Sequence, residues 1–145
     1  PPPRRASAVA VARFQGKPIT YGVIGSCANG RLEDLRVAAS ILKGRKVHPD
    51  VTLNITPGSM EVYLEAVKEG LIQTLVEARI LLPAPSCGMC GESNHLGPED
   101  VCIASTTVNH PGRMGSDKAD IYLASPATVA ASAVAGCMTD PREFL

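Results

Sequence analysis

The chain has 145 residues, enough for one domain with a sizeable core, and it carries 14 basic and 14 acidic side chains. This balance gives no electrostatic reason to expect nucleic acid or an anionic membrane as a partner. No apolar stretch approaches the roughly 20 residues of a membrane span. Five cysteines, an odd number, argue against a secreted disulfide framework, so we expect free or metal-bound thiols and a cytoplasmic protein.

Residues 1–18 are rich in Pro, Arg and Ala and predict a linker or extended N-terminal segment. The domain is therefore expected to cover residues 19–145. A short buried strand over 19–24 opens it and leads into a turn of small residues. Helical spacing of apolar side chains then predicts a helix over 32–42, which Gly44 ends.

The middle of the chain predicts a strand followed by two helices. Residues 51–56 alternate as a strand, and Ser59 is a candidate N-cap for a helix that ends at Gly70. The apolar residues expected on the buried face of this helix are Met60, Leu64 and Val67. A further helix over about 72–78 and a short buried strand over 80–82 are expected to follow.

The last part of the chain predicts strands over 101–105 and 121–123, separated by a polar loop over 106–119. Pro126 suits the first turn of an Ala-rich helix that runs to Ala135. The alternation of strands and helices predicts an α/β fold, a three-layer domain with a mostly parallel sheet flanked by helices. Loops at the carboxyl ends of such strands converge on one edge of the sheet.

Three cysteines stand in loops that follow predicted strands. Cys87 and Cys90 form a Cys-x-x-Cys pair, which is compatible with a zinc half-site, a redox dithiol or part of an iron–sulfur site. A zinc ribbon needs a second such pair or a histidine pair, and the three histidines are scattered. Cys27, between glycines, offers a third thiol that a cluster could use. Cys102 lies in an apolar strand, so we expect its thiol to be buried in the core, and we expect Cys137 to be structural as well.

Five segments of the sequence carry a family resemblance. They are GSCANGRLEDL at 25–35, TPGS at 56–59, CGMC at 87–90, GRMG at 112–115 and YLASPATVAASA at 122–133. In this order they resemble the third, iron–sulfur domain of the aconitase superfamily, most closely its branch of isopropylmalate dehydratase, homoaconitase and dimethylmalate dehydratase large subunits. The resemblance covers residues 19–145.

This resemblance implies a hydro-lyase that dehydrates and rehydrates a hydroxy di- or tricarboxylic acid, as the isopropylmalate dehydratases of leucine biosynthesis do. It implies that Cys27, Cys87 and Cys90 bind a [4Fe–4S] cluster with one iron not ligated by the protein. By the same match, Ser26 and Asn29 are expected to contact the cofactor.

The resemblance also implies substrate-binding residues. Arg113 and Asn109 match positions expected to bind the hydroxy-acid substrate, and Arg113 is expected to hold a carboxylate. Relatives usually carry an Asn-Arg pair just before this segment, where this chain has Thr107-Val108. We therefore expect one substrate-holding cation to be missing.

The remaining large-subunit domains or a swivel-domain small subunit are the partners that the resemblance implies. Alone, the chain is then expected to bind a cluster and to turn over poorly. Two other functions stay open. A non-catalytic, cluster-binding module is favoured by Thr107-Val108, and a thiol–disulfide protein would use Cys87 and Cys90.

Overall fold

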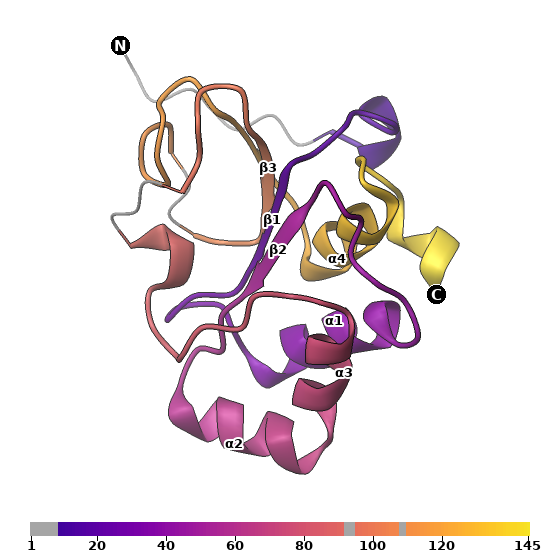
Figure 1. Cartoon of the computed structure of the whole chain (residues 1–145), viewed down its shortest axis with the longest axis vertical. Coiled ribbons are helices and arrows are strands. Elements are labelled where there is room, and N and C mark those ends of the chain that lie inside the picture. Colours follow the sequence, from indigo (N-terminus) through magenta and orange to yellow (C-terminus); the bar gives the residue numbers. More distant parts are fainter. Residues whose placement is uncertain (1–8, 92–94, 108–109) are drawn as a thin grey trace.

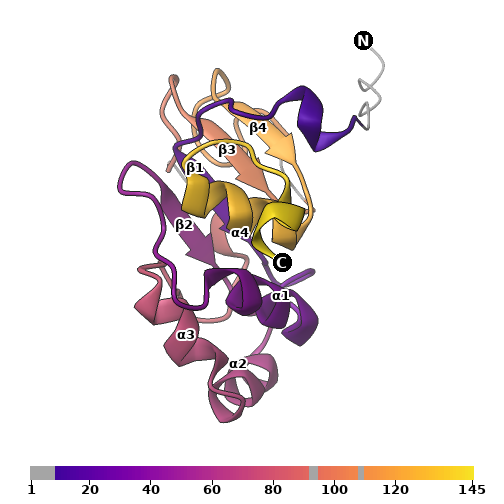
Figure 2. The ribbon, with the colours of Figure 1, turned by 90° about the vertical axis from the view of Figure 1, so that its right-hand side faces the viewer.

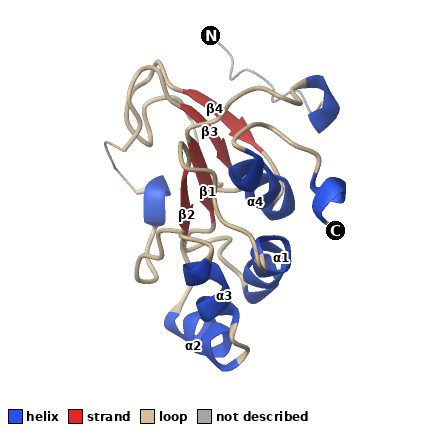
Figure 3. Ribbon diagram, turned by 45° about the vertical axis from the view of Figure 1, so that its right-hand side comes forward, coloured by secondary structure: helices blue, strands red, loops and turns tan. Residues whose placement is uncertain are grey.

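The computed structural model describes residues 9–91, 95–107 and 110–145. Within these residues four strands form one sheet, in the order β2-β1-β3-β4, with every pair parallel (Figure 3). The strands are β1 (Tyr21–Ile24), β2 (Thr52–Ile55), β3 (Val101–Ala104) and β4 (Asp120–Leu123). Helices flank this sheet, so the predicted α/β fold with a mostly parallel sheet is confirmed.

The carboxyl ends of β1, β2 and β3 lie at the same edge of the sheet. Ile24 at the end of β1 pairs with Ile55 in β2, and Val23 pairs with Ala104 in β3. Just beyond β2, the N–H of Thr56 donates to the carbonyl oxygen of Ile24 at 2.9 Å. The loops after these strands therefore start side by side, where parallel sheets usually place their ligand sites.

The helices gather around one face and one end of the sheet. Helix α4 (Pro126–Ala135) lies against the strands, and α1 (Leu32–Leu42) packs beside it (Figure 2). Helices α2 (Met60–Lys68) and α3 (Leu71–Glu77) pack on α1, and α2 lies farthest from the sheet (Figure 1). The large buried side chains between these layers include Ile24, Leu35, Ile41, Leu42, Leu53, Ile55, Leu75 and Val129. None of the helices in the described part of the chain is long and apolar enough to span a membrane.

The opposite face of the sheet carries a second, smaller buried cluster. Its members are Val23, Cys102 and Ala104 from the strands, and Met89, Leu96, Met114 and Ala119 from the segments between them. Met89 belongs to the short 3-10 turn η2 (Gly88–Cys90) and is only 2% exposed. The turn that bears Cys90 is therefore anchored in the core by the residue next to it.

Side-chain caps define the starts of two helices. Ser59 accepts a hydrogen bond from the N–H of Val62 at 3.2 Å, and Ser125 accepts one from the N–H of Thr128 at 3.2 Å. Such caps satisfy backbone donors that a helix start leaves unpaired. Pro126 occupies the first turn of α4, and α4 has the predicted bounds.

The prediction for the buried face of α2 is wrong. Met60, Leu64 and Val67 are 56%, 54% and 49% exposed, whereas Ala66 is fully buried. The three side chains do recur at helical spacing. However, α2 is the outermost helix (Figure 1). The side of α2 that packs on its neighbours carries Ala66. Periodicity thus identified a stripe on the helix, but a stripe does not reveal what covers it.

The strand predicted over 80–82 is reduced to one bridge, in which Leu81 pairs in parallel with Asn54 of β2. The N–H of Leu81 donates to the carbonyl oxygen of Leu53 at 2.8 Å, and its own carbonyl accepts from the N–H of Ile55 at 3.0 Å. Two prolines follow within four residues, and proline cannot donate to a ladder. The pairing between this segment and β2 therefore stops after one residue. The chain then continues to η2.

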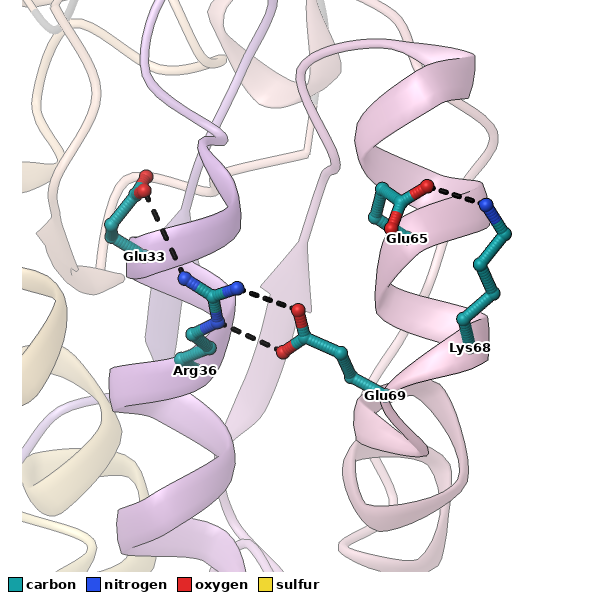
Figure 4. A network of polar contacts seen from close by, with 5 residues as sticks. All are labelled: Glu33, Arg36, Glu65, Lys68 and Glu69. Atoms are coloured by element: carbon teal, nitrogen blue, oxygen red, sulfur yellow. Dashed lines mark hydrogen bonds and ion pairs between the residues drawn. The ribbon is translucent and has the colours of Figure 1, made fainter.

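An ion pair joins α2 to α1 (Figure 4). Arg36 on α1 donates from Nε and Nη2 to the two carboxylate oxygens of Glu69, at 2.8 and 2.6 Å. This contact lowers the pKa of Glu69 below its ordinary value. Glu33 lies 3.9 Å from the same guanidinium, and Lys68 pairs with Glu65 within α2 at 2.5 Å.

Residues 9–18, the described part of the segment expected to be a linker, contact the end of the domain. They include the short 3-10 turn η1 (Val11–Arg13). The N–H of Gly16 donates to the carbonyl oxygen of Met138 at 2.9 Å, and Pro18 forms an antiparallel bridge with Cys137. This stretch therefore lies beside the residues that follow α4.

Candidate functional site

The turn after β1 brings Cys27 to the surface at the carboxyl edge of the sheet. Gly25, which has φ +82°, lets the chain turn sharply as it leaves the strand. A Cβ atom on Gly25 would lie 2.2 Å from the carbonyl oxygen of Thr56, so only glycine fits there. The turn closes when the N–H of Gly30 donates to the carbonyl of Ser26 at 3.0 Å. Cys27 is left exposed at its tip.

The other two candidate thiols lie at either end of η2. Cys87 precedes the turn and is exposed, whereas Cys90 closes it and is buried. The N–H of Cys90 donates to the carbonyl oxygen of Cys87 at 3.2 Å, which holds the two residues on one short turn. The buried side chain of Met89 fixes that turn against the sheet.

The fold brings these cysteines together from distant parts of the sequence. Cys27 Sγ lies 3.8 Å from Cys87 Sγ, although 60 residues separate them. The hydrogen bond with Cys87 raises the pKa of the Cys27 thiol, as do the charges of Cys87 and, less strongly, of Cys90. All three are free thiols. The predicted convergence at one sheet edge therefore holds for these residues.

The donor set suits an iron–sulfur cluster in its chemistry, because such clusters are held by cysteine thiolates. Each iron of a cluster takes its own thiolate, which requires thiols spread around the cluster rather than gathered on one atom. In residues 9–91, 95–107 and 110–145, no three His, Cys, Asp or Glu side chains are grouped to hold a single metal ion. Cys27 and Cys87 are both exposed, so their side chains have room to move apart.

Ser26 and Asn29 hold the Cys27 turn to its surroundings. Ser26, which is 1% exposed, donates from its hydroxyl to the side-chain oxygen of Asn29 at 2.6 Å. The amide of Asn29 in turn donates to the carbonyl oxygen of Ser105, just after β3. The two polar side chains therefore tie the turn after β1 to the segment after β3, and their expected contact with a cofactor stays a prediction.

Arg113 lies beside the turn that carries the cysteine pair. It donates from Nε to the backbone carbonyl oxygen of Cys90 at 2.7 Å. Its segment is fixed by the buried side chain of Met114 and by a parallel bridge between Leu96 and Gly115. The predicted substrate-binding arginine therefore lies next to the candidate ligands, as sequence order alone could not show.

The rest of the predicted substrate segment is described only in part. Asn109 and Val108 lie outside the described residues. Thr107 and His110, on either side of that gap, are exposed. The N–H of Arg113 donates to the carbonyl oxygen of His110, three residues earlier, at 3.1 Å. This is the hydrogen bond of a turn, and it agrees with the loop predicted for this segment.

Two cysteines lie away from this site. Cys102 is fully buried in β3, as predicted, and burial raises the pKa of its thiol to about 12. Cys137, just after α4, is half-buried with its sulfur 3.7 Å from Oγ1 of Thr139.

Sequence reasoning gave no role to Thr56, which lies between the Cys27 turn and η2. It is fully buried. The sequence signals near it were its place in the TPGS segment at 56–59 and the glycines at positions 25, 30, 58 and 88.

Comparison with known proteins gives consistent matches. Residues 5–136 match the family model of the Aconitase family (aconitate hydratase). The chain is 48% identical over 144 residues to the 3-isopropylmalate dehydratase large subunit of Wolinella succinogenes, covering 98% of this chain and 34% of that protein. It is 48% identical over 139 residues to the Mycolicibacterium smegmatis large subunit of that name, covering 94% of this chain and 33% of that protein.

A relative with another name matches to the same degree. The homoaconitase large subunit of Thermus thermophilus is 48% identical over 137 residues, covering 92% of this chain and 32% of that protein. The chain thus spans about a third of the length of the relatives it matches.

Proposed function

We propose that this chain, which belongs to the aconitase family, forms the iron–sulfur domain of a hydro-lyase of the isopropylmalate dehydratase or homoaconitase type. The observation that carries the proposal is the 3.8 Å separation between the sulfurs of Cys27 and Cys87. Cys90 lies on the same turn as Cys87. Aconitase-family hydro-lyases are generally iron–sulfur enzymes, and three converging free thiols are the ligands such a group requires.

Cys27, Cys87 and Cys90 would hold a [4Fe–4S] cluster, leaving one iron without a protein ligand. When bound, such a group supplies a Lewis acid that can polarise a substrate hydroxyl. The chain's own contribution is to bring the thiols to one edge of the sheet. Reduced thiols in this role suit a reducing compartment such as the cytoplasm.

Arg113 would bind a carboxylate of the hydroxy-acid substrate. Its hydrogen bond to the carbonyl oxygen of Cys90 places a permanent positive charge beside the thiols. A carboxylate that approaches the site meets this guanidinium, which can orient the substrate through charge-assisted hydrogen bonds. Asn109 is proposed as a second substrate contact on its motif match alone, because it lies outside the described residues.

Further polypeptide would complete the active site. The relatives are named large subunits, and this chain spans about a third of their length. We infer that the remaining large-subunit domains and a small subunit supply the other substrate contacts and the catalytic base. The chain alone would then bind the cluster and turn over poorly.

One feature of the sequence favours a second function, a cluster-binding module without catalysis. Where the family resemblance leads us to expect an Asn-Arg pair, this chain has Thr107-Val108. Valine cannot bind a carboxylate, so one cation of the substrate site is replaced. The module would still hold the cluster, since the three cysteines are present.

The test is an activity assay on the chain joined to the missing large-subunit domains and small subunit of a close relative. Dehydration of 3-isopropylmalate or homocitrate is followed by the ultraviolet absorbance of the alkene acid formed. We expect turnover that Cys27→Ser abolishes and Cys137→Ser does not. Cluster binding without turnover would support the non-catalytic module. Full activity of the isolated chain, or of Cys27→Ser, would contradict the proposal.

A further inference from the structure

Thr56 lies where three segments of the site meet. It is the first residue after β2 and is fully buried. Its N–H donates to the carbonyl oxygen of Ile24, the last residue of β1, at 2.9 Å. Thr56 is therefore fixed to the strand from which the Cys27 turn departs.

The backbone of Thr56 packs directly against the Cys27 turn. Its carbonyl oxygen would lie 2.2 Å from a Cβ atom on Gly25 and 2.2 Å from one on Gly30. These glycines flank Cys27, at the start and the end of its turn. Two residues later, the N–H of Gly58 donates to the carbonyl oxygen of Gly30 at 2.7 Å. The turn thus rests on the segment that begins at Thr56 and has little room to shift toward it.

The side chain of Thr56 packs against the turn with the cysteine pair. A Cβ atom on Gly88, the residue after Cys87, would lie 2.6 Å from Oγ1 and 3.1 Å from Cβ of Thr56. Real Cβ atoms essentially never approach as closely as the first of these distances. Gly88 therefore sits in direct contact with Thr56, and its position depends on the volume of that side chain.

The orientation of this side chain is itself fixed. Oγ1 of Thr56 donates to the side-chain oxygen of Asn54 at 3.0 Å. Threonine is branched at Cβ, so this hydrogen bond also sets where its methyl group points. A rigid, buried group therefore separates the Cys27 turn on one side from Gly88 on the other.

We propose that Thr56 is a positioning residue that sets the distance between Cys27 and the Cys87–Cys90 turn. The expected effect on cluster assembly rests on the proposed function. The effect on the separation of the thiols concerns the protein without a cluster and does not depend on that function. A larger group at the contact between Thr56 and Gly88 would push Cys87 away from Cys27. Removing that group would let the turn return.

The experiment measures the approach of the two thiols without any cluster. Diamide oxidises two neighbouring thiols to a disulfide and is itself reduced to the hydrazine, taking up both electrons and both protons. The rate of Cys27–Cys87 disulfide formation is followed by peptide mass mapping in the full chain. The variant Gly88→Ala is expected to lower this rate by about tenfold. The control is Gly44→Ala, which has the same left-handed backbone, with φ +72°, but nothing within 4 Å of the added Cβ.

The second variant separates the contact from backbone strain. Combining Gly88→Ala with Thr56→Ala removes Oγ1 and the methyl group, and we expect most of the lost rate to return. Thr56→Ile alone, with a larger buried side chain, is expected to slow the reaction as Gly88→Ala does. Anaerobic cluster loading, read as visible absorbance per chain, should follow the same order among these variants. Thermal unfolding midpoints identify a variant that has failed to fold.

An unchanged rate in Gly88→Ala and Thr56→Ile, both folded, would overturn the inference. So would a double variant no faster than Gly88→Ala. If thiol approach responds as expected but no variant, including the unmodified chain, takes up a cluster, the positioning role stands and the proposed function fails. If the cluster loads equally in all variants although thiol approach changes, the positioning role in cluster assembly is overturned.

Discussion

Arg113 donates a hydrogen bond from Nε to the backbone carbonyl oxygen of Cys90 at 2.7 Å. The residue proposed to bind substrate is thereby linked to a residue proposed to bind the cluster. The arginine guanidinium has several N–H donors, so it can make this contact with one nitrogen and offer others to a substrate carboxylate. Lysine carries one compact ammonium group on a flexible stem and lacks this planar arrangement of donors.

The first prediction concerns this link. In the assembled enzyme, Arg113→Lys is expected to lower kcat/KM by about tenfold to a hundredfold, because a hydrogen bond to a charged group is lost. Steady-state kinetics at matched iron content measures the effect, and KM should rise. Arg142→Lys, at the pair that the exposed Arg142 side chain forms with Asp140, is the control and should leave the kinetics unchanged. Equal kinetic constants for Arg113→Lys and the unmodified enzyme would refute the role of Arg113.

A second prediction concerns the buried thiol of Cys102, whose pKa burial raises to about 12. In the unfolded chain a cysteine loses its proton near its ordinary pKa of about 8.5, so above that pH the folded state holds the extra proton. The free energy of unfolding should therefore fall as pH rises from about 9 toward 12, by at most about 1.4 kcal/mol per pH unit from this group.

Urea unfolding at several alkaline pH values, on the unmodified chain and on Cys102→Ala, isolates this contribution. The pH slope should be smaller in Cys102→Ala, although that variant is less stable overall. The same pKa predicts that iodoacetamide labels exposed Cys27 and Cys87 in the folded apo protein well before Cys102. Equal slopes, or early labelling of Cys102, would contradict the burial of this thiol.

The third prediction tests the ion pair between α1 and α2. Because Arg36 lowers the pKa of Glu69, the stabilisation is present above the ordinary carboxyl range and is lost as pH falls through the folded pKa. Arg36→Gln should therefore lower the unfolding midpoint modestly at neutral pH, and this difference should shrink below about pH 4. Lys68→Gln, which removes a pair within α2 only, is the matched control (Figure 4). A difference that grows in acid would be inconsistent with the pair.

The fourth prediction compares two leucines on neighbouring helices. Leu64 on α2 is 54% exposed, whereas Leu75 on α3 is fully buried. Leu64→Lys should change the free energy of unfolding by no more than about 0.5 kcal/mol, and Leu75→Ala should lower it by about 2–5 kcal/mol. Chemical denaturation of both variants provides the measurement. Comparable losses would mean that Leu64 is covered in solution.

Local sequence signals were sufficient for the framework. The bounds of α1 follow from apolar spacing, and those of α4 from the prolyl first turn at Pro126. These signals act within a few residues, so they can be read from the chain directly. The same holds for β1 and β3, whose apolar runs differ from the observed strands by one or two residues.

Features that depend on how the elements pack against one another could not be predicted from local sequence signals. The face of α2 was assigned incorrectly because Ala66, the residue that is buried, carries less apolar surface than Leu64 or Met60. The strand over 80–82 was overextended because an apolar run does not show how many backbone partners are within reach.

In the candidate site, one feature could be predicted from the sequence and two could not. The convergence of Cys27 with Cys87 followed from strand order, since both segments leave the same edge of a parallel sheet. The contact of Arg113 with Cys90 and the place of Thr56 between two turns did not follow, because both depend on side-chain packing between loops. Motif matching located Arg113, and only the fold showed what it touches.

The most direct measurement is anaerobic iron and sulfide loading of the full chain, with visible absorbance and iron content compared between the unmodified protein, Cys27→Ala and Cys102→Ala. If a sulfur from the first turn completes the cluster site, the unmodified protein and Cys102→Ala take up about four iron atoms per chain. Cys27→Ala should then take up far less. Equal loading in Cys27→Ala would show that the pair at 87 and 90 acts without it and would contradict the account.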